Sequence, residues 1–342
     1  MSILSILSTT LKVAALSVFK PVNASFGLLK DKEDERDWKY SALRAKDEGI
    51  GIAYSPKNYR KQISTLSVKD QRPYNICCFA AATLQKEKDE GVELSPRSLV
   101  AYAKSAGYIT GNGYSSLRNA QQAVIEHGIA EASLVKEEPK NDWSMYSSHY
   151  SLLAKPIKEN AAKHKAKSQL LLTSQSDWFH ALDNDRIIQT GCKWYTGYNN
   201  LKDPYVLPIG SGVYVGGHSF ACVGYDIGNK VFICQNSFGS NWGSNGIFYV
   251  RFADFSAFYQ GRLTVDIPEI VNTVAATYEG KDIKSNNDPK IYRVMGGKKL
   301  LYPDEKTFFS WGGKFGTDKT WVMVSSQILS AIPDGGVMKL KA

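Results

Sequence analysis

Apolar and polar positions follow two different periods along the chain. In the first half, apolar residues recur every three to four positions between helix-starting and helix-ending residues, which predicts helices over 77–90, 94–107, 114–128 and 174–185. Later the period changes to two, which predicts successive strands in "RIIQTGCKWY", "GGHSFACVGYD", "KVFICQNSF", "GIFYVRF" and "GRLTVDI". Helices followed by strands indicate an α+β fold built from two packed parts.

The flanking stretches divide the chain. We expect an N-terminal segment over 1–40, a main domain over 41–267, a linker rich in Asn, Asp, Pro and Lys over 268–290, and a small module over 291–342. Residues 3–19 are apolar but too short to span a bilayer, so no transmembrane span is predicted. Three interpretations of this apolar stretch stay open: a helix that docks on the body or on a partner, a signal peptide, and a short pro-segment.

Composition narrows the function classes. The 342 residues have an ordinary apolar content of 43% and a net charge of +9, without any accompanying nucleic-acid motif, so no nucleic-acid partner is predicted. The five cysteines are odd in number and two are adjacent, which argues against a disulfide framework and predicts at least one free thiol. No Cys or His spacing typical of zinc is present, and neither a metal nor another cofactor is expected.

Candidate chemistry gathers at three places. "DQRPYNICCFAA" (70–81) puts Cys77 and Cys78 where a helix is predicted to start, and a helix N-terminus favours a thiolate. His218 begins a strand after two glycines, and Asn236 ends the next strand. Adjacent antiparallel strands would bring His218 and Asn236 side by side, facing the thiol across a cleft.

These three stretches, in this order, resemble the papain-like cysteine peptidases. That family has Asp-Gln-Gly-x-x-x-x-Cys-Trp-Ala-Phe, then Gly-His-Ala with Val-Gly-Tyr, then Asn-Ser-Trp-Gly; this chain has "DQRPYNICCFA", "GGHSFACVGYD" and "NSFGSNWGSNG". The resemblance covers residues 35–267. It implies a two-lobed fold, with a helical left lobe and an antiparallel, barrel-like right lobe; the small C-terminal module, which we expect to be β-rich, lies outside the resemblance.

The resemblance also implies residue roles. Gln71 matches the oxyanion-hole glutamine, His218 the general base and Asn236 the residue that orients it. Counting from Gln71 without a gap makes Cys77 the nucleophile and leaves Cys78 where the family has Trp; a one-residue insertion would make Cys78 the nucleophile instead. Phe238 stands where the family has a Trp that shields the His–Asn hydrogen bond.

Two functions follow from this comparison. The first is a cysteine endopeptidase that hydrolyses protein or peptide substrates through a Cys-His-Asn triad and a thioester. The alternative is a weakly active or inactive papain-fold protein with a structural or adhesive role on a virion or cell surface. Residues 291–336 resemble a short unit of bacterial extracellular and phage-associated proteins, which favours an extracellular, cell-envelope or virion-associated location and a docking partner for the module.

Overall fold

The architecture comes from a computed structural model that describes residues 26–34, 37–41, 54–110, 113–135, 154–266 and 277–341. The apolar stretch 3–19 lies outside these ranges, so its three interpretations remain predictions. No helix in the described ranges is both long and apolar enough to cross a membrane.

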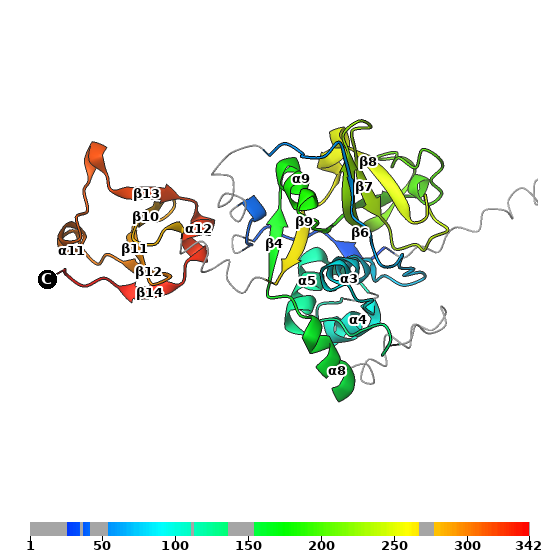
Figure 1. The fold of residues 1–342 in the computed structure, drawn as a ribbon, viewed down its shortest axis with the longest axis horizontal. Helices are drawn as coiled ribbons and strands as arrows, with labels where there is room; N and C mark the ends of the chain where they lie inside the picture. The colour runs from blue at the N-terminus through cyan, green and yellow to red at the C-terminus, as the bar shows by residue number, and fades with distance from the viewer. Residues whose placement is uncertain are drawn as a thin grey trace, which may run out of the picture.

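The predicted helices are present. α3 (Cys77–Glu90) ends at Gly91, whose left-handed φ of 69° closes the last turn, and α4 (Pro96–Ser105) begins with proline after Ser95. α9 spans Gln175–Asp183. α5 (Leu117–Glu126) starts three residues later than the predicted helix at 114–128, because Ser115–Ser116 form the short strand β3. The Ser116 hydroxyl then caps α5 by accepting a hydrogen bond from the Asn119 N–H. A further short helix, α8, spans Lys155–Ala161. Figure 1 shows α3, α4, α5 and α8 gathered in one part of the main body, α9 beside the strands, and the C-terminal strands as a separate group.

The second part is a seven-stranded antiparallel sheet that contains the five predicted strands and two that the period did not reveal, β2 (Arg60–Gln62) and β4 (Ser168–Leu172), which precede α9 in the chain. Its path does not return to its starting strand, so the described residues form no closed barrel. The strands run in the order β4, β9 (Gly261–Val265), β5 (Ile188–Tyr195), β6 (Tyr214–Asp226), β7 (Val231–Gln235) and β8 (Ile247–Arg251), with β2 paired to β6.

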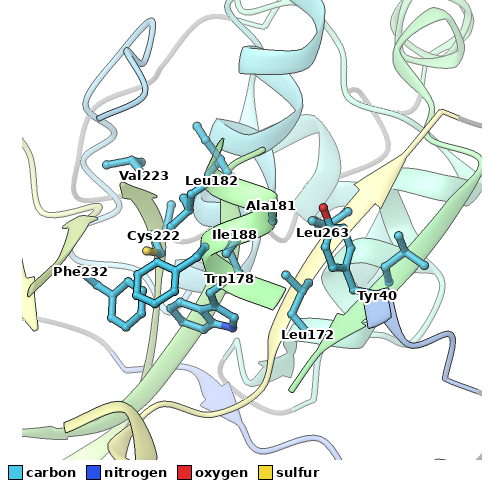
Figure 2. Close-up of a cluster of buried hydrophobic side chains, with 14 of the residues drawn as sticks. Tyr40, Leu172, Trp178, Ala181, Leu182, Ile188, Cys222, Val223, Phe232 and Leu263 are labelled. Carbon is cyan, nitrogen blue, oxygen red and sulfur yellow. The ribbon is translucent and has the colours of Figure 1, made fainter. Parts of the chain in front are cut away.

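One apolar core holds α9 against this sheet. Figure 2 shows Trp178 and Leu182 of α9 beside Ile188, Phe232 and residues of the neighbouring strands. A second core lies between α3, α4 and α5. Helix α3 packs against both α5 and the central strand β6, so it joins the two parts. The first turn of α3 is thereby fixed relative to the sheet.

The N-terminal strap, defined here as residues 26–34, is held on the body by both strand pairing and charge. Its strand β1 (Leu28–Leu29) pairs in parallel with β3. Asp31 accepts hydrogen bonds from the Arg118 N–H and from Arg262, whose side chain is almost completely buried. Asp37, just beyond the strap, accepts from the guanidinium groups of both arginines, so two carboxylates share the Arg262 guanidinium.

The C-terminal module is a five-stranded sheet in the order β13 (Trp321–Val324), β10 (Asp282–Ser285), β11 (Ile291–Met295), β12 (Lys298–Leu301) and β14 (Asp334–Val337). Two short helices, α11 (Glu305–Ser310) and α12 (Ser326–Ala331), accompany it. Strand β10 lies inside the stretch expected to be linker, at 268–290. Its four residues carry only one apolar side chain, Ile283, which is too little for a recognisable period, yet β10 pairs with both β11 and β13.

We expect the shared carboxylate Asp37 to be important for stability. Asp37→Ala leaves the buried Arg262 with Asp31 as its remaining carboxylate and should lower the free energy of unfolding by about 1.5–3 kcal/mol, measured by urea denaturation. The control Asp254→Ala removes the partly exposed pair between Arg251 and Asp254, and should cost less than about 1 kcal/mol. Equal losses in the two variants would contradict this prediction.

The same group makes stability depend on pH. Burial opposes the ionisation of Asp37, but Arg118 and Arg262 outweigh it and lower the pKa of this carboxyl. A carboxyl whose pKa is lowered by folding stabilises the protein above its ordinary pKa, and this contribution disappears as the pH falls through the lowered value. The stability difference between the parent chain and Asp37→Ala should therefore shrink in acid.

Candidate active site

Cys77 is the first residue of α3 and is completely buried. Its N-cap, Ile76, supplies no side-chain hydrogen bond to the first turn. The amide groups at this end of the helix therefore keep their positive partial charge available to an anion. A thiolate at Cys77 would lie in this favourable field.

His218 lies in the central strand β6, and Asn236 directly follows β7. The two strands are paired antiparallel, and His218 Nε2 is 2.7 Å from Asn236 Oδ1. This bond leaves Nδ1, which is buried and has no formed hydrogen bond to any described residue. Nδ1 is therefore the ring nitrogen available to the Cys77 thiol.

The two adjacent cysteines have opposite electrostatic surroundings. Burial opposes ionisation of Cys77, but the Cys78 thiol, the His218 ring and the Ser219 backbone outweigh it and lower the pKa of Cys77 well below its ordinary value. Burial and the neighbouring Cys77 raise the pKa of Cys78. The Cys78 thiol also donates to the Ser115 carbonyl oxygen at 3.6 Å. The thiol near His218 is thus Cys77, while Cys78 is directed toward β3.

Gln71 is tied to the residue that follows Asn236. Its backbone N–H donates to the Ser237 carbonyl, and the Ser237 hydroxyl donates to Gln71 Oε1 at 2.5 Å. Gln71 Nε2 donates to the Tyr74 carbonyl. The structure therefore brings Gln71, Cys77, His218 and Asn236 together, although the first two come from the N-terminal half of the body and the last two from the sheet.

The strap lies directly on this site. The Ser115 N–H donates to the Gly27 carbonyl at 2.8 Å, and the Phe26 ring lies edge-on to His218, with centroids 5.8 Å apart. A Cβ built on Gly217 would lie 2.2 Å from the Leu28 carbonyl oxygen. The strap backbone therefore passes close to the residue before His218, and a larger residue at position 217 would push it away.

The four candidate residues could be named from the sequence, but the strap could not. Gly216 and Gly217 were its only signal, because two glycines before His218 permit a close backbone approach from another segment. Ser237 was also missed, since its contact with Gln71 spans 166 positions and leaves no local pattern. In the described part of the chain, no three His, Cys, Asp or Glu side chains form a group that could hold a metal ion.

Comparisons with known proteins give the fold. No protein-family model matches the chain, and neither does any curated protein sequence. Among solved structures, it is similar to xylellain, a cysteine protease from Xylella fastidiosa, with 15% identity over 73% of this chain and 99% of that chain and a TM-score of 0.57. Digestive procathepsin L 3 of Tenebrio molitor larval midgut matches with 15% identity over 72% and 77% of the two chains and a TM-score of 0.51.

A second procathepsin from Tenebrio molitor larval midgut, procathepsin L2, matches with 14% identity, 73% and 81% coverage and a TM-score of 0.50. At such identities the similarity concerns the arrangement of the backbone, and it agrees with the resemblance seen in the sequence motifs. The chain therefore has the fold of the papain-like cysteine proteases.

Proposed function

We propose that this protein is a cysteine peptidase in which Cys77 is the nucleophile, His218 the general acid and base, and Asn236 the residue that orients His218. The observation that carries the proposal is the placement of the Cys77 thiol at a helix N-terminus beside a histidine whose other nitrogen is fixed by Asn236. A lowered thiol pKa at a buried site with a named charge partner is a property of catalytic cysteines.

The reaction follows from this arrangement. The Cys77 thiolate attacks the carbonyl carbon of a peptide bond, and His218 donates its Nδ1 proton to the nitrogen as the carbon–nitrogen bond breaks. Water then attacks the thioester while His218 accepts a proton, which releases the acid and restores Cys77. Asn236 keeps Nδ1 directed at the sulfur throughout, because its oxygen accepts from Nε2.

We propose the Gln71 amide and the Cys77 backbone N–H as the donors that stabilise the oxyanion. Gln71 is suited to this role because Ser237 and Tyr74 hold its side chain from two sides. A donor that is fixed before the reaction needs no reorganisation when charge develops, and loss of one such donor typically reduces kcat by about 10²–10³-fold.

The strap supports a peptide as the substrate. An extended segment of this chain already lies beside Cys77 and His218 and pairs with β3 through its main chain. Main-chain pairing of this kind accepts many sequences, while side-chain contacts select among them. We therefore propose that β3 also binds extended peptide substrates, and that the strap must leave before they enter. This corresponds to the pro-segment interpretation of the N-terminal segment.

Replacing each cysteine in turn separates the two possible nucleophiles. We expect Cys77→Ala to abolish hydrolysis of peptide substrates and to remove the thiolate absorbance that the folded parent chain shows below neutral pH. Cys78→Ala is the matched control and should retain hydrolysis and a titrating thiolate at Cys77, with the thiolate appearing at a somewhat higher pH because the Cys78 thiol no longer stabilises it. Full activity in Cys77→Ala would contradict the proposal, and a parent chain without a thiolate below neutral pH would favour the structural or adhesive alternative.

Gly27→Val tests the strap. A Cβ at Gly27 would lie 2.5 Å from the Asn75 carbonyl oxygen and 2.9 Å from that of Gly113, so valine cannot occupy this place. We expect Gly27→Val to raise kcat/KM for a peptide substrate by at least about tenfold. The variant loses the few main-chain hydrogen bonds, of about 1 kcal/mol each, that hold the strap over the site.

The matched control for this variant is Leu29→Ala, a change in the same strand at a side chain that is 45% exposed. It should leave kcat/KM within about a factor of two of the parent value, as expected for a surface substitution. If Gly27→Val and Leu29→Ala have the same kcat/KM as the parent chain, the strap does not restrict access to the site.

A further inference from the structure

Aromatic rings surround His218 at two distances. Among the described residues, the Phe238 and Trp194 rings have centroids 4.6 Å and 4.5 Å from the imidazole, while those of Phe26 and Phe220 lie at 5.8 Å and 6.3 Å. Phe26 belongs to the strap and leaves when the strap leaves. The close rings that remain on the body are therefore Phe238 and Trp194.

Trp194 reaches His218 from the neighbouring strand. In the β5–β6 register, Cys192 lies opposite His218 and Trp194 lies opposite Gly216. Residues directly opposite one another project from the same face, so Trp194 is a diagonal neighbour of His218 on that face. Gly216 has no side chain, which leaves room for the indole to lean toward the imidazole.

Other contacts fix the indole in this position. Trp194 Nε1 donates to Asn199 Oδ1 at 2.9 Å, and the Trp242 indole donates to the Asn199 carbonyl at 3.1 Å. The Trp194 ring also lies edge-on to Phe238, with centroids 5.7 Å apart, and is completely buried. Trp194 is therefore held by a hydrogen bond on one side and by packing on the other.

We propose that Trp194 is a positioning residue that, together with Phe238, excludes water from the hydrogen bond between His218 and Asn236; this inference rests on the peptidase function proposed above. The Phe238 ring approaches the imidazole from the segment after β7, and the Trp194 indole brings a second apolar surface to it from β5. In a dry environment the bond from the charged imidazole to Asn236 is stronger, and the ring stays directed at Cys77.

The test measures Cys77 ionisation as well as activity. The thiolate absorbance of each variant is titrated with pH, and the absorbance of the same variant carrying Cys77→Ala is subtracted as the background. Each titration is done twice, once in the full chain and once in the full chain carrying Gly27→Val, in which the strap is displaced. In the Gly27→Val chain, Trp194→Ala should raise the acid midpoint of Cys77 by at least about one pH unit. Hydrolysis measured as kcat/KM should fall roughly 10- to 100-fold, as expected when a hydrogen bond to a charged group is lost.

The matched control is Trp178→Phe. Trp178 is an equally buried indole of the same core, visible in Figure 2, but its ring contacts are with Phe232, Phe255 and Phe258 and not with His218. This variant should unfold at a lower temperature with an unchanged acid midpoint. Adding Phe238→Trp to Trp194→Ala restores an indole beside His218 and should return the midpoint toward that of the parent.

Each outcome decides the proposal. A midpoint that stays unchanged in Trp194→Ala, with activity lost only in step with stability as in Trp178→Phe, overturns it and leaves the peptidase proposal intact. If Trp194→Ala does not fold, Trp194→Phe decides, and it must still raise the midpoint relative to Trp178→Phe. A parent chain without any Cys77 thiolate would overturn the proposed function and this inference together.

Discussion

The contact between the first turn of α3 and strand β6 is the constraint on which the rest of the structure depends. It brings the Cys77 thiol from the helical part to the imidazole of His218, which the sheet holds in its central strand. Each group alone would be an ordinary buried residue. Together they let the positive end of the helix, the imidazole and the Asn236 hydrogen bond act on one sulfur atom.

Because the site is buried, a charge on Cys77 needs specific neighbours to stabilise it. Desolvation opposes the charged form of Cys77, so its lowered pKa depends on the Cys78 thiol, the His218 ring and the Ser219 backbone acting together. Asn236 orients the ring without adding a negative charge that would compete with the thiolate. The same dry environment strengthens these contacts, and the strap completes it by covering the site with Phe26 and the main chain of residues 27–29. Under the proposed function, the strap that keeps this site dry would also have to leave before a substrate could enter.

Much of the fold could be predicted because its signals are local. Helix α3 ends before Gly91, α4 begins at Pro96 after Ser95, and a strand such as β9 alternates polar and apolar residues, so short windows were sufficient. The candidate residues could be named because three motifs occur in the same order as in the papain-like peptidases, and the structure brings these residues together. Their catalytic roles remain predictions, as do the domain boundaries.

The features that could not be predicted depend on distant contacts. Strand β1 of the strap has two residues, which is too short to show any period. Asp31, later in the strap, accepts a hydrogen bond from Arg262, which lies 231 positions away. Trp194 looks like any inward residue of an alternating strand, and only the register that places it opposite Gly216 reveals its contact with His218. The sequence of strand β10 likewise resembles a linker, and only its pairing with β11 and β13 shows that it is a strand.

The most direct measurement of the central claim is the site of covalent labelling by a thiol-directed epoxide. The full chain and its Gly27→Val variant would be incubated with the reagent near neutral pH and then mapped by peptide mass spectrometry. We predict a single adduct on Cys77, formed much faster in Gly27→Val because the strap no longer covers the sulfur. An adduct on Cys78, or equally slow labelling of Cys77 and the other buried cysteines in both chains, would contradict it.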